Sequence, residues 1–240
     1  MTGSRDTVMQ RVRQALGKTA TDPAALAEAQ AYLDAHGRGP APAFVGDRIL
    51  RFIKRAGDME STVARIGNRS EIPAAIARYL DALDLAPGRG SQADAPLSGE
   101  LSGVAGQHHA RRGVCWPEFA DLDWTVAGLS VEARPTVGDD RLGITGVFCA
   151  IAETGTLVVV SGADTPTATT LLPETHVAVV ARERIVDTME DAFALIRAER
   201  GRVPRAINLI SGPSRTGDIE QTIVVGAHGP FRVHILVVAA

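Results

Sequence analysis

The sequence predicts an α/β fold, a single open sheet with helices on both faces, preceded by a helical N-terminal extension. Residues 142–240 contain several near-continuous apolar, β-branched runs, the pattern of parallel strands buried on both faces. Amphipathic segments with helical spacing alternate with these runs, as in layered α/β proteins. The start of the chain shows helical periodicity and no strand pattern. We therefore divide the chain into an extension, residues 1–40, and an α/β domain, residues 41–240.

The first half of the chain supplies most of the expected helices. Apolar side chains recur at helical spacing over residues 6–16, and residues 23–36 form a second, Ala-rich helix. Residues 46–57 are amphipathic, and a short β-rich segment follows at 61–66. Residues 70–83 begin with a proline in the first turn, which is typical of a helix start.

The second half supplies most of the expected strands. Residues 86–99 are rich in turn formers and poor in large apolar groups, so we expect a mobile loop there. The segment 175–210 reads strand, helix, strand, which predicts a right-handed crossover unit. Expected strands cover 124–126, 143–152, 157–161, 175–180, 206–210, 222–226 and 233–238, with a helix at 187–199 and a loop at 211–218.

Composition excludes several classes of protein. At 240 residues the chain is long enough to bury a sizeable core without a metal or a disulfide. Its 25 basic and 28 acidic side chains give a net charge of −3, which argues against a general nucleic-acid or membrane-surface binder. No N-terminal apolar segment resembles a signal peptide, and no apolar run approaches transmembrane length. We expect a cytoplasmic protein that does not insert into membranes.

The cysteines argue against a metal or cluster site in this chain. There are two, Cys115 and Cys149, far apart in the sequence, with no CxxC, no Cys-His cluster and no HExxH motif. Structural zinc and iron–sulfur sites need closely spaced ligands. The sequence therefore predicts no metal site, suggests no disulfide and leaves the reactivity of either thiol open.

The first of three polar segments at strand ends is Glu153-Thr-Gly-Thr156, between two apolar runs. In open α/β sheets, ligands bind outside the carboxyl ends of strands, so we expect these segments to line such a crevice. A carboxylate between buried strands is costly unless it is paired or faces a cleft. Glu153 is therefore a candidate catalytic group, and Thr154, Gly155 and Thr156 are candidate ligand-binding residues. An ordinary turn remains the alternative.

The second segment is Ser211-Gly-Pro-Ser-Arg-Thr-Gly-Asp-Ile-Glu220, directly after an apolar run. Three hydroxyls, exposed backbone N–H groups and the guanidinium of Arg215 are suited to binding a carboxylate or a phosphate. Asp218 can cap a following helix or turn. In the alternative, Arg215 pairs with Asp218 or Glu220 and the loop is only a capped connection. The candidate ligand-binding residues are Ser211, Gly212, Ser214, Arg215, Thr216, Asp218 and Glu220.

The third segment, Gly226-Ala-His-Gly-Pro230, lies between the last two expected strands. Turn residues flank His228, so its imidazole can stand at the mouth of a crevice as an acid, a base or a hydrogen-bond donor. We take His228 as a candidate catalytic residue and Gly229 as part of the ligand site. A hairpin histidine without a function is the alternative.

Together these segments resemble a known family. GITGVFCAIAETGT (143–156), ISGPSRTGDIEQT (210–222) and VGAHGP (225–230) resemble the LUD domain family, and within it the lactate utilization protein C branch. The resemblance is close over residues 142–240. Over residues 1–140 it extends only to the order of elements, a helical start followed by an α/β half. The three motifs are specific together, in this order and at these separations. Gly217 stands where the family commonly has alanine.

The resemblance implies both a fold and a role. The fold would belong to the NagB/RpiA/CoA-transferase-like α/β group. The family is associated with oxidation of L-lactate to pyruvate, alongside two partner proteins that carry iron–sulfur ligands. This chain would then be the cluster-free member, with no cofactor of its own. The matched residues that would carry over are those of the three polar segments.

Three functional hypotheses follow, and they leave open whether the chain is an enzyme. In the first, it is a cluster-free component of an L-lactate utilization system, and its loops bind a small carboxylate, another anionic ligand or a partner surface. In the second, it is a stand-alone CoA-transferase-like or phosphosugar-type enzyme. Glu153 would then act as nucleophile or base, and Arg215 would hold the anionic substrate. In the third, it is a non-catalytic interaction subunit.

Overall fold

The computed structural model describes residues 3–17, 22–40, 43–84, 111–137, 139–219, 222–225 and 228–239. The chain divides into two compact units, Met1–Ala43 and Phe44–Ala240. The segment 86–99, predicted to form a mobile loop, lies outside the described residues.

The N-terminal unit consists of two helices, α1 (Ser4–Ala15) and α2 (Pro23–Ala35), at the predicted positions. The start of α2 follows from its sequence. The Asp22 carboxylate accepts a hydrogen bond from the Ala24 N–H at 2.9 Å, and Pro23 occupies the first turn, where its missing N–H leaves no bond unmade. Neither helix contains a buried residue among those described.

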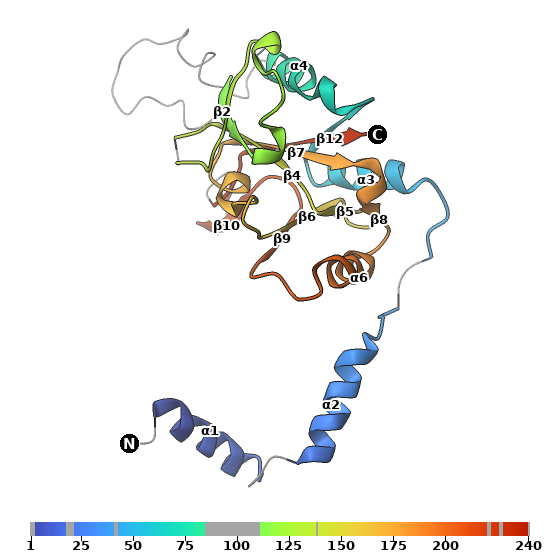
Figure 1. Cartoon of the computed structure of the whole chain (residues 1–240), viewed down its shortest axis with the longest axis vertical. Helices are drawn as coiled ribbons and strands as arrows, with labels where there is room; N and C mark the ends of the chain where they lie inside the picture. Colours follow the sequence, from blue (N-terminus) through green and yellow to red (C-terminus); the bar gives the residue numbers. More distant parts are fainter. Residues whose placement is uncertain are drawn as a thin grey trace. The chain divides into compact units, whose positions relative to one another are not determined.

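The second unit is built on a six-stranded parallel sheet (Figure 1). Its strand order is β1-β12-β7-β4-β2-β3, and every neighbouring pair is parallel. The strands are β1 (Thr62–Ile66), β2 (Arg112–Cys115), β3 (Ser130–Ala133), β4 (Leu142–Gly146), β7 (Thr175–Ala181) and β12 (Arg232–Val238).

Helices cover both faces of this sheet, as its continuous apolar strands require. On one face, Ile76 of α4 (Ile72–Asp84) packs in a core with Val177 and Leu236. On the other face, Phe52 of α3 (Arg48–Asp58) belongs to a core with Ala178 and Ile235. Adjacent residues of one strand thus point to opposite cores. The predicted α/β class with helices on both faces is confirmed.

A smaller sheet stacks against the α3 face. Its strand order is β8-β5-β6-β9, and β6 is antiparallel to both of its neighbours. Helix α6 (Met189–Arg200) covers its outer side, where Ile196 packs with Ile151 and Val158. The strands are β5 (Cys149–Ile151), β6 (Thr156–Val160), β8 (Ile185–Val186) and β9 (Ile207–Ile210).

The remaining elements are short. Strands β10 (Arg215–Ile219) and β11 (Thr222–Val225) pair with each other as an antiparallel ribbon. The 3-10 turns are η1 (Arg69–Glu71), η3 (Pro117–Phe119), η4 (Thr125–Ala127), η5 (Thr167–Thr170) and η6 (Arg182–Arg184). Within the described residues, no helix combines the length and the apolar character needed to cross a bilayer.

The expectation of a single sheet is corrected, because the described strands fall into three. The predicted strand 143–152 divides into β4 of the large sheet and β5 of the small one. The predicted crossover over 175–210 is also wrong, because β7 lies in the large sheet while β9 pairs with β6. An apolar run indicates that a strand is buried, but it does not indicate which sheet the strand joins. That depends on the neighbouring strands, which are distant in sequence.

Two local predictions also differ from the structure. The expected strand at 124–126 lies in the turn η4, because the Asp123 carboxylate accepts hydrogen bonds from both the N–H and the hydroxyl of Thr125. The expected loop at 211–218 is a loop only as far as Ser214, where β10 begins. Asp218 therefore lies in a strand, and its side chain, predicted to cap a helix or turn, lies outside the described residues.

Candidate functional site

The first and second polar segments meet through a short chain of hydroxyl groups. The Thr154 hydroxyl donates to Thr156 Oγ1 at 2.8 Å, and Thr156 Oγ1 lies 2.7 Å from Ser211 Oγ. Antiparallel pairing of β6 with β9 sets Leu157 opposite Ile210, which brings the residues at the strand ends together. Thr154 and Ser211 are exposed while Thr156 is buried, so the chain of hydroxyls joins two exposed side chains through a buried one.

Two glycines allow the first and second polar segments to pack closely against the C-terminal end of α3. Gly155 and Gly212 have φ values of +71° and +84°, a conformation that side chains with a Cβ rarely adopt. A Cβ on Gly155 would collide with the backbone of Arg55 and Ala56, and one on Gly212 would collide with the Met59 carbonyl oxygen. The end of α3 is therefore part of the site, and no motif in that segment had indicated it.

The Arg215 guanidinium forms an ion pair with Glu60. The alternative interpretation, a pair with Asp218 or Glu220, involves side chains outside the described residues. The Arg215 side chain is 42% exposed and that of Glu60 is 62% exposed, so the pair is solvated and contributes little to stability. Glu60 has a φ of +64°, an uncommon conformation for a residue with a side chain. The side chains of Thr216 and Asp218, and the whole of Glu220, lie outside the described residues.

The second and third segments meet at Ser214. Its N–H donates to the Pro230 carbonyl oxygen at 2.9 Å, and its hydroxyl oxygen accepts from the His228 N–H at 3.4 Å. A Cβ on Gly229 would lie 3.2 Å from Ser214 Cβ, so that glycine allows a close approach. His228 is exposed. The structure thus brings all three segments together, with Ser211 to Arg215 at the centre.

Glu153 points to a different neighbour. Its Oε1 accepts a hydrogen bond from the Met189 N–H at 2.9 Å, and its own N–H donates to the Asp187 carbonyl oxygen. The carboxylate therefore lies at the N-terminus of α6, where the helix dipole favours negative charge. This contact explains why a glutamate lies between two apolar strands. From the sequence, we predict instead that the carboxylate faces a cleft, with an ordinary turn as the alternative.

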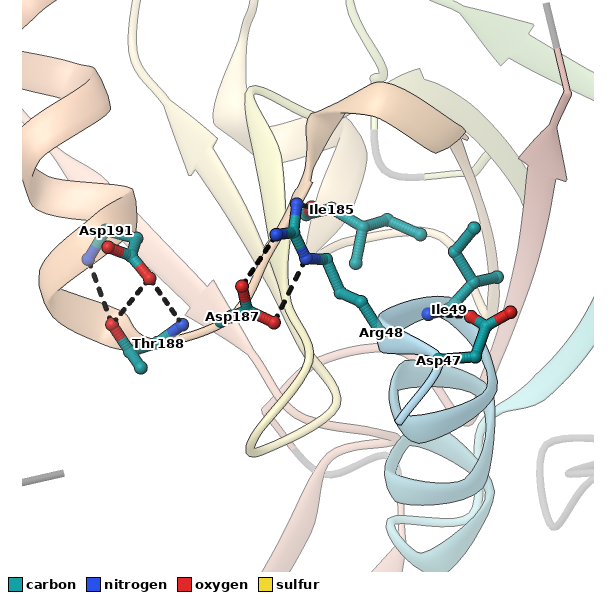
Figure 2. Close-up of polar contacts among 7 residues, drawn as sticks. All are labelled: Asp47, Arg48, Ile49, Ile185, Asp187, Thr188 and Asp191. Carbon is teal, nitrogen blue, oxygen red and sulfur yellow. Dashed lines mark hydrogen bonds and ion pairs between the residues drawn. The ribbon is translucent and has the colours of Figure 1, made fainter. Parts of the chain in front are cut away.

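The same α6 terminus is tied to the start of α3 (Figure 2). The Arg48 guanidinium donates to both carboxylate oxygens of Asp187, at 3.0 and 2.7 Å, and to the Ile185 carbonyl oxygen at 3.1 Å. Thr188 and Asp191 form a reciprocal capping box on α6. Glu153 therefore belongs to a structural junction that fixes α6 against the small sheet.

The meeting point of the three segments is at the amino ends of the parallel strands. Gly212 rests on Met59, just before β1, and Pro230 lies just before β12. The sequence predicts the opposite edge, where open α/β sheets bind ligands. The difference arises because the antiparallel strand β9 delivers Ser211 back to the edge where β1 and β12 begin. We refer to Thr154, Thr156, Ser211, Ser214, Arg215 and His228 as the amino-edge cluster.

Two buried histidines, which no sequence motif indicates, lie in the strands beneath this edge. His234 Nδ1 is 2.8 Å from Thr62 Oγ1, and its ring stacks on Tyr79 at a centroid distance of 3.9 Å. His176 Nε2 is 2.8 Å from Thr145 Oγ1. Burial lowers the pKa of each imidazole from 6.5 to about 4, so both are neutral near pH 7.

Neither cysteine lies in the amino-edge cluster. Cys115 and Cys149 are both buried and free, and burial raises the pKa of each thiol to about 11. Within the described part of the chain, no group of three or more His, Cys, Asp or Glu side chains is arranged to hold a metal ion.

Two cavities lie elsewhere on the second unit. One, of about 440 Å³, is lined by Arg112, Arg134 and Asp140 among others, and Arg134 and Asp140 pair with each other. The other, of about 530 Å³, lies between Asp47 and Arg182 at the start of α3. Neither contains a residue of the amino-edge cluster.

Known proteins show the same combination of fold and motifs. The sequence profile of the LUD domain matches residues 49–238. Lactate utilization protein C of Bacillus licheniformis is 39% identical over 127 residues, which cover 51% of this chain and 53% of that protein. Lactate utilization protein C of Halalkalibacterium halodurans is 39% identical over 158 residues, covering 59% and 69%. The chain spans about half the length of most of the curated relatives it matches.

A solved structure supports the fold. The crystal structure of a DUF162 family protein from Deinococcus radiodurans matches with a TM-score of 0.51 and 25% identity, covering 82% of this chain and 99% of that one. The fold of most of this chain is therefore shared with a known protein. Because the LUD domain profile extends over most of the sequence, the chain belongs to the LUD domain family.

Proposed function

We propose that this protein is a component of an L-lactate utilization system in the cytoplasm, and that its amino-edge cluster binds a small carboxylate. The relatives named lactate utilization protein C support the pathway. The carboxylate is supported by Arg215, whose ion pair with Glu60 is exposed. An exposed pair of this kind is worth only about 0–1 kcal/mol, so a ligand carboxylate can replace Glu60 at small cost.

Hydroxyl groups beside Arg215 suit a 2-hydroxy acid or a 2-oxo acid. Ser211 and Ser214 come from the loop that leads into β10, and Ser214 also contacts the segment that carries His228. A guanidinium can bind a carboxylate through two parallel hydrogen bonds, and neighbouring hydroxyls can donate to or accept from the adjacent oxygen of lactate or pyruvate. The ligand class that follows is a short 2-substituted carboxylate.

Oxidation of L-lactate to pyruvate releases two electrons and two protons, so an acceptor is required. We propose that this chain binds no cofactor and that iron–sulfur partner proteins accept these electrons. Both thiols of this chain are buried, with a pKa raised to about 11, which supports a role in binding and not in electron transfer. Its contribution would be to hold the carboxylate or to organise the partners.

The alternative of a CoA-transferase-like or phosphosugar-type enzyme uses Glu153 as nucleophile or base. The hydrogen bond from Met189 to the Glu153 carboxylate instead favours a structural role for this residue. We therefore place the binding function first. The interaction-subunit hypothesis is kept as an outcome of the experiment that follows.

The experiment compares ligand binding to the wild-type chain, to Arg215→Ala and to a control, Arg202→Ala, which removes an exposed arginine after α6. A ligand present at about 100 times its Kd stabilises a protein by about 2.7 kcal/mol. We expect L-lactate or pyruvate to raise the Tm of wild type and of Arg202→Ala but not of Arg215→Ala. No response of wild type to either acid would reject the binding function.

A genetic test separates the pathway from the ligand. A strain that lacks this gene should grow poorly on L-lactate, and the wild-type gene should restore growth. If Arg215→Ala also restores growth fully, the chain acts as an interaction subunit whose loops need not bind the acid. Normal growth of the deletion strain would reject a role in lactate utilization.

A further inference from the structure

Ser61 is a buried polar residue directly before β1, at the border of the amino-edge cluster. It is 6% exposed, and its hydroxyl oxygen has no hydrogen-bond partner among the described residues. Buried hydroxyls in folded proteins nearly always have a partner, because a hydrogen bond left unmade in the interior is costly. The Ser61 hydroxyl therefore requires a partner that the described part of the chain does not supply.

The main chain places Ser61 in the turn against which the first two polar segments pack. Its N–H donates to the Ala56 carbonyl oxygen at 3.0 Å, and this bond closes the C-terminal turn of α3. Gly155 of the first segment lies against the backbone of Ala56, and Gly212 of the second lies against the Met59 carbonyl oxygen. Ser61 thus belongs to the turn on which both segments rest.

The residue before Ser61 is unusual for the end of a helix. The Glu60 N–H donates to the Gly57 carbonyl oxygen at 2.9 Å, and together with the Ser61 bond this makes a Schellman motif. Glu60 occupies its left-handed position, with a φ of +64°, where glycine is usual. Residues held in such conformations cluster at ligand sites. The glutamate found here is the one whose carboxylate occupies the Arg215 guanidinium, the group assigned to the ligand.

We propose that Ser61 is a ligand-binding residue, and that its hydroxyl binds the 2-oxygen of a 2-hydroxy or 2-oxo acid whose carboxylate replaces Glu60 on Arg215. This assignment rests on the binding function proposed above and names the residue that selects the ligand. A serine hydroxyl both donates and accepts, so it can pair with the oxo group of pyruvate and with the hydroxyl of lactate. The buried hydroxyl of Ser61 then gains its hydrogen bond when the ligand binds.

Burial makes Ser61 a selective contact. The hydroxyls of Ser211 and Ser214 already have partners, Thr156 and the His228 N–H, whereas the Ser61 hydroxyl has none among the residues described. A buried group that bonds a ligand oxygen discriminates against an analogue without that oxygen, because the group stays unpaired in the complex. Propionate has the carboxylate and the carbon chain of lactate but lacks the 2-oxygen. We therefore expect the chain to bind L-lactate and pyruvate in preference to propionate.

Isothermal titration calorimetry of the whole chain with L-lactate, pyruvate and propionate tests the assignment. We expect the wild type to bind the two 2-substituted acids at least about tenfold more tightly than propionate. Ser61→Ala should weaken binding of these two acids about tenfold or more and change the Kd for propionate less than about threefold. Without ligand, the Tm of Ser61→Ala should equal that of the wild type, because the removed hydroxyl has no partner among the described residues.

Thr169→Val is the matched control. Thr169 is 0% exposed and its hydroxyl also lacks a partner within the described residues, but it packs over Gly143 of β4, three strands away from β1. This variant should bind all three acids as the wild type does. Unchanged selectivity in Ser61→Ala would overturn the assignment, and so would a lower Tm without ligand, since the hydroxyl would then have a structural partner such as a buried water. Equal binding of L-lactate and propionate by the wild type would overturn the assignment alone, whereas no binding of any acid would also reject the proposed function.

Discussion

The hydroxyl oxygens of Thr156 and Ser211 lie 2.7 Å apart although 55 positions separate them in the chain. Thr156 is 3% exposed, so its hydroxyl depends on Thr154 and Ser211 for hydrogen bonds. The contact joins the first residue of β6 to the residue that follows β9. It is the link that connects the first two motif segments.

Removing the Thr156 hydroxyl should be costly. Thr156→Val keeps the shape of the side chain and loses both hydrogen bonds, so we expect the free energy of unfolding to fall by about 1–3 kcal/mol. Urea denaturation measures this. Thr154→Val removes only one of these two hydrogen bonds, from an exposed side chain, and leaves the bond to Ser211, so it should cost less, about 0.5–1 kcal/mol. Equal losses in the two variants would contradict the special position of Thr156.

Alanine at Gly155 or Gly212 should destabilise the protein by about 2–4 kcal/mol. Each glycine has a positive φ, and each would place a Cβ against the backbone of α3. Gly201 is a matched control, because it has a φ of +65° with nothing within 4 Å of a Cβ. Gly201→Ala should cost only about 1 kcal/mol, the conformational part of the effect. A comparable loss at all three positions would show that packing against α3 is unimportant.

Glu153 should affect the stability of the fold more than ligand binding. Glu153→Ala removes the acceptor for the Met189 N–H at the start of α6, so we expect a loss of about 1–2 kcal/mol in unfolding free energy. Glu153→Gln keeps an acceptor oxygen and should lose less than about 1 kcal/mol. Both should retain the response to L-lactate or pyruvate. If Glu153→Gln abolishes that response at unchanged stability, the residue belongs to the ligand site.

Stability should fall between pH 6.5 and pH 4. The pKa values of His176 and His234 are lowered from 6.5 to about 4 by burial, so the unfolded chain binds more protons than the folded chain in this window. The histidine contribution is complete above pH 6.5 and declines as the pH falls, by at most on the order of 3 kcal/mol per histidine. Urea denaturation across this range measures the slope.

A substitution separates the histidines from other titrating groups. His234→Phe retains an aromatic ring to stack on Tyr79 and removes the ionisation, so the pH dependence should flatten by about half. An unaltered slope in His234→Phe would assign the pH dependence to other groups.

Glu60→Asn should strengthen binding of the proposed carboxylate. The substitution releases Arg215 from its ion pair, and asparagine adopts the left-handed conformation more readily than glutamate. We expect Kd for L-lactate or pyruvate to fall about two- to fivefold, in line with the small value of an exposed pair. Isothermal titration calorimetry measures the change. Weaker binding in Glu60→Asn would mean that Glu60 helps to position the ligand.

Several elements could be predicted from the sequence because their causes are local. The helices at 23–36 and 187–199 were predicted within two residues, and both have caps supplied by neighbouring side chains, Asp22 for α2 and the Thr188–Asp191 pair for α6. The strands at 175–180 and 233–238 are buried on both faces, and their continuous apolar runs predict this burial. The turn at Thr125 shows the limit, since one aspartate outweighed β propensity.

The sequence by itself determined the α/β class and the three polar segments that the LUD domain family shares. It could do so because helix periodicity, helix caps and strand burial depend on residues that are close together in the chain. Only the tertiary structure decided that β4 and β5 belong to different sheets, that the Glu153 carboxylate accepts a hydrogen bond from the Met189 N–H, and that Arg215 pairs with Glu60. These partners are distant in the chain, and a contact between them depends on how the sheets stack. No local pattern contains that information.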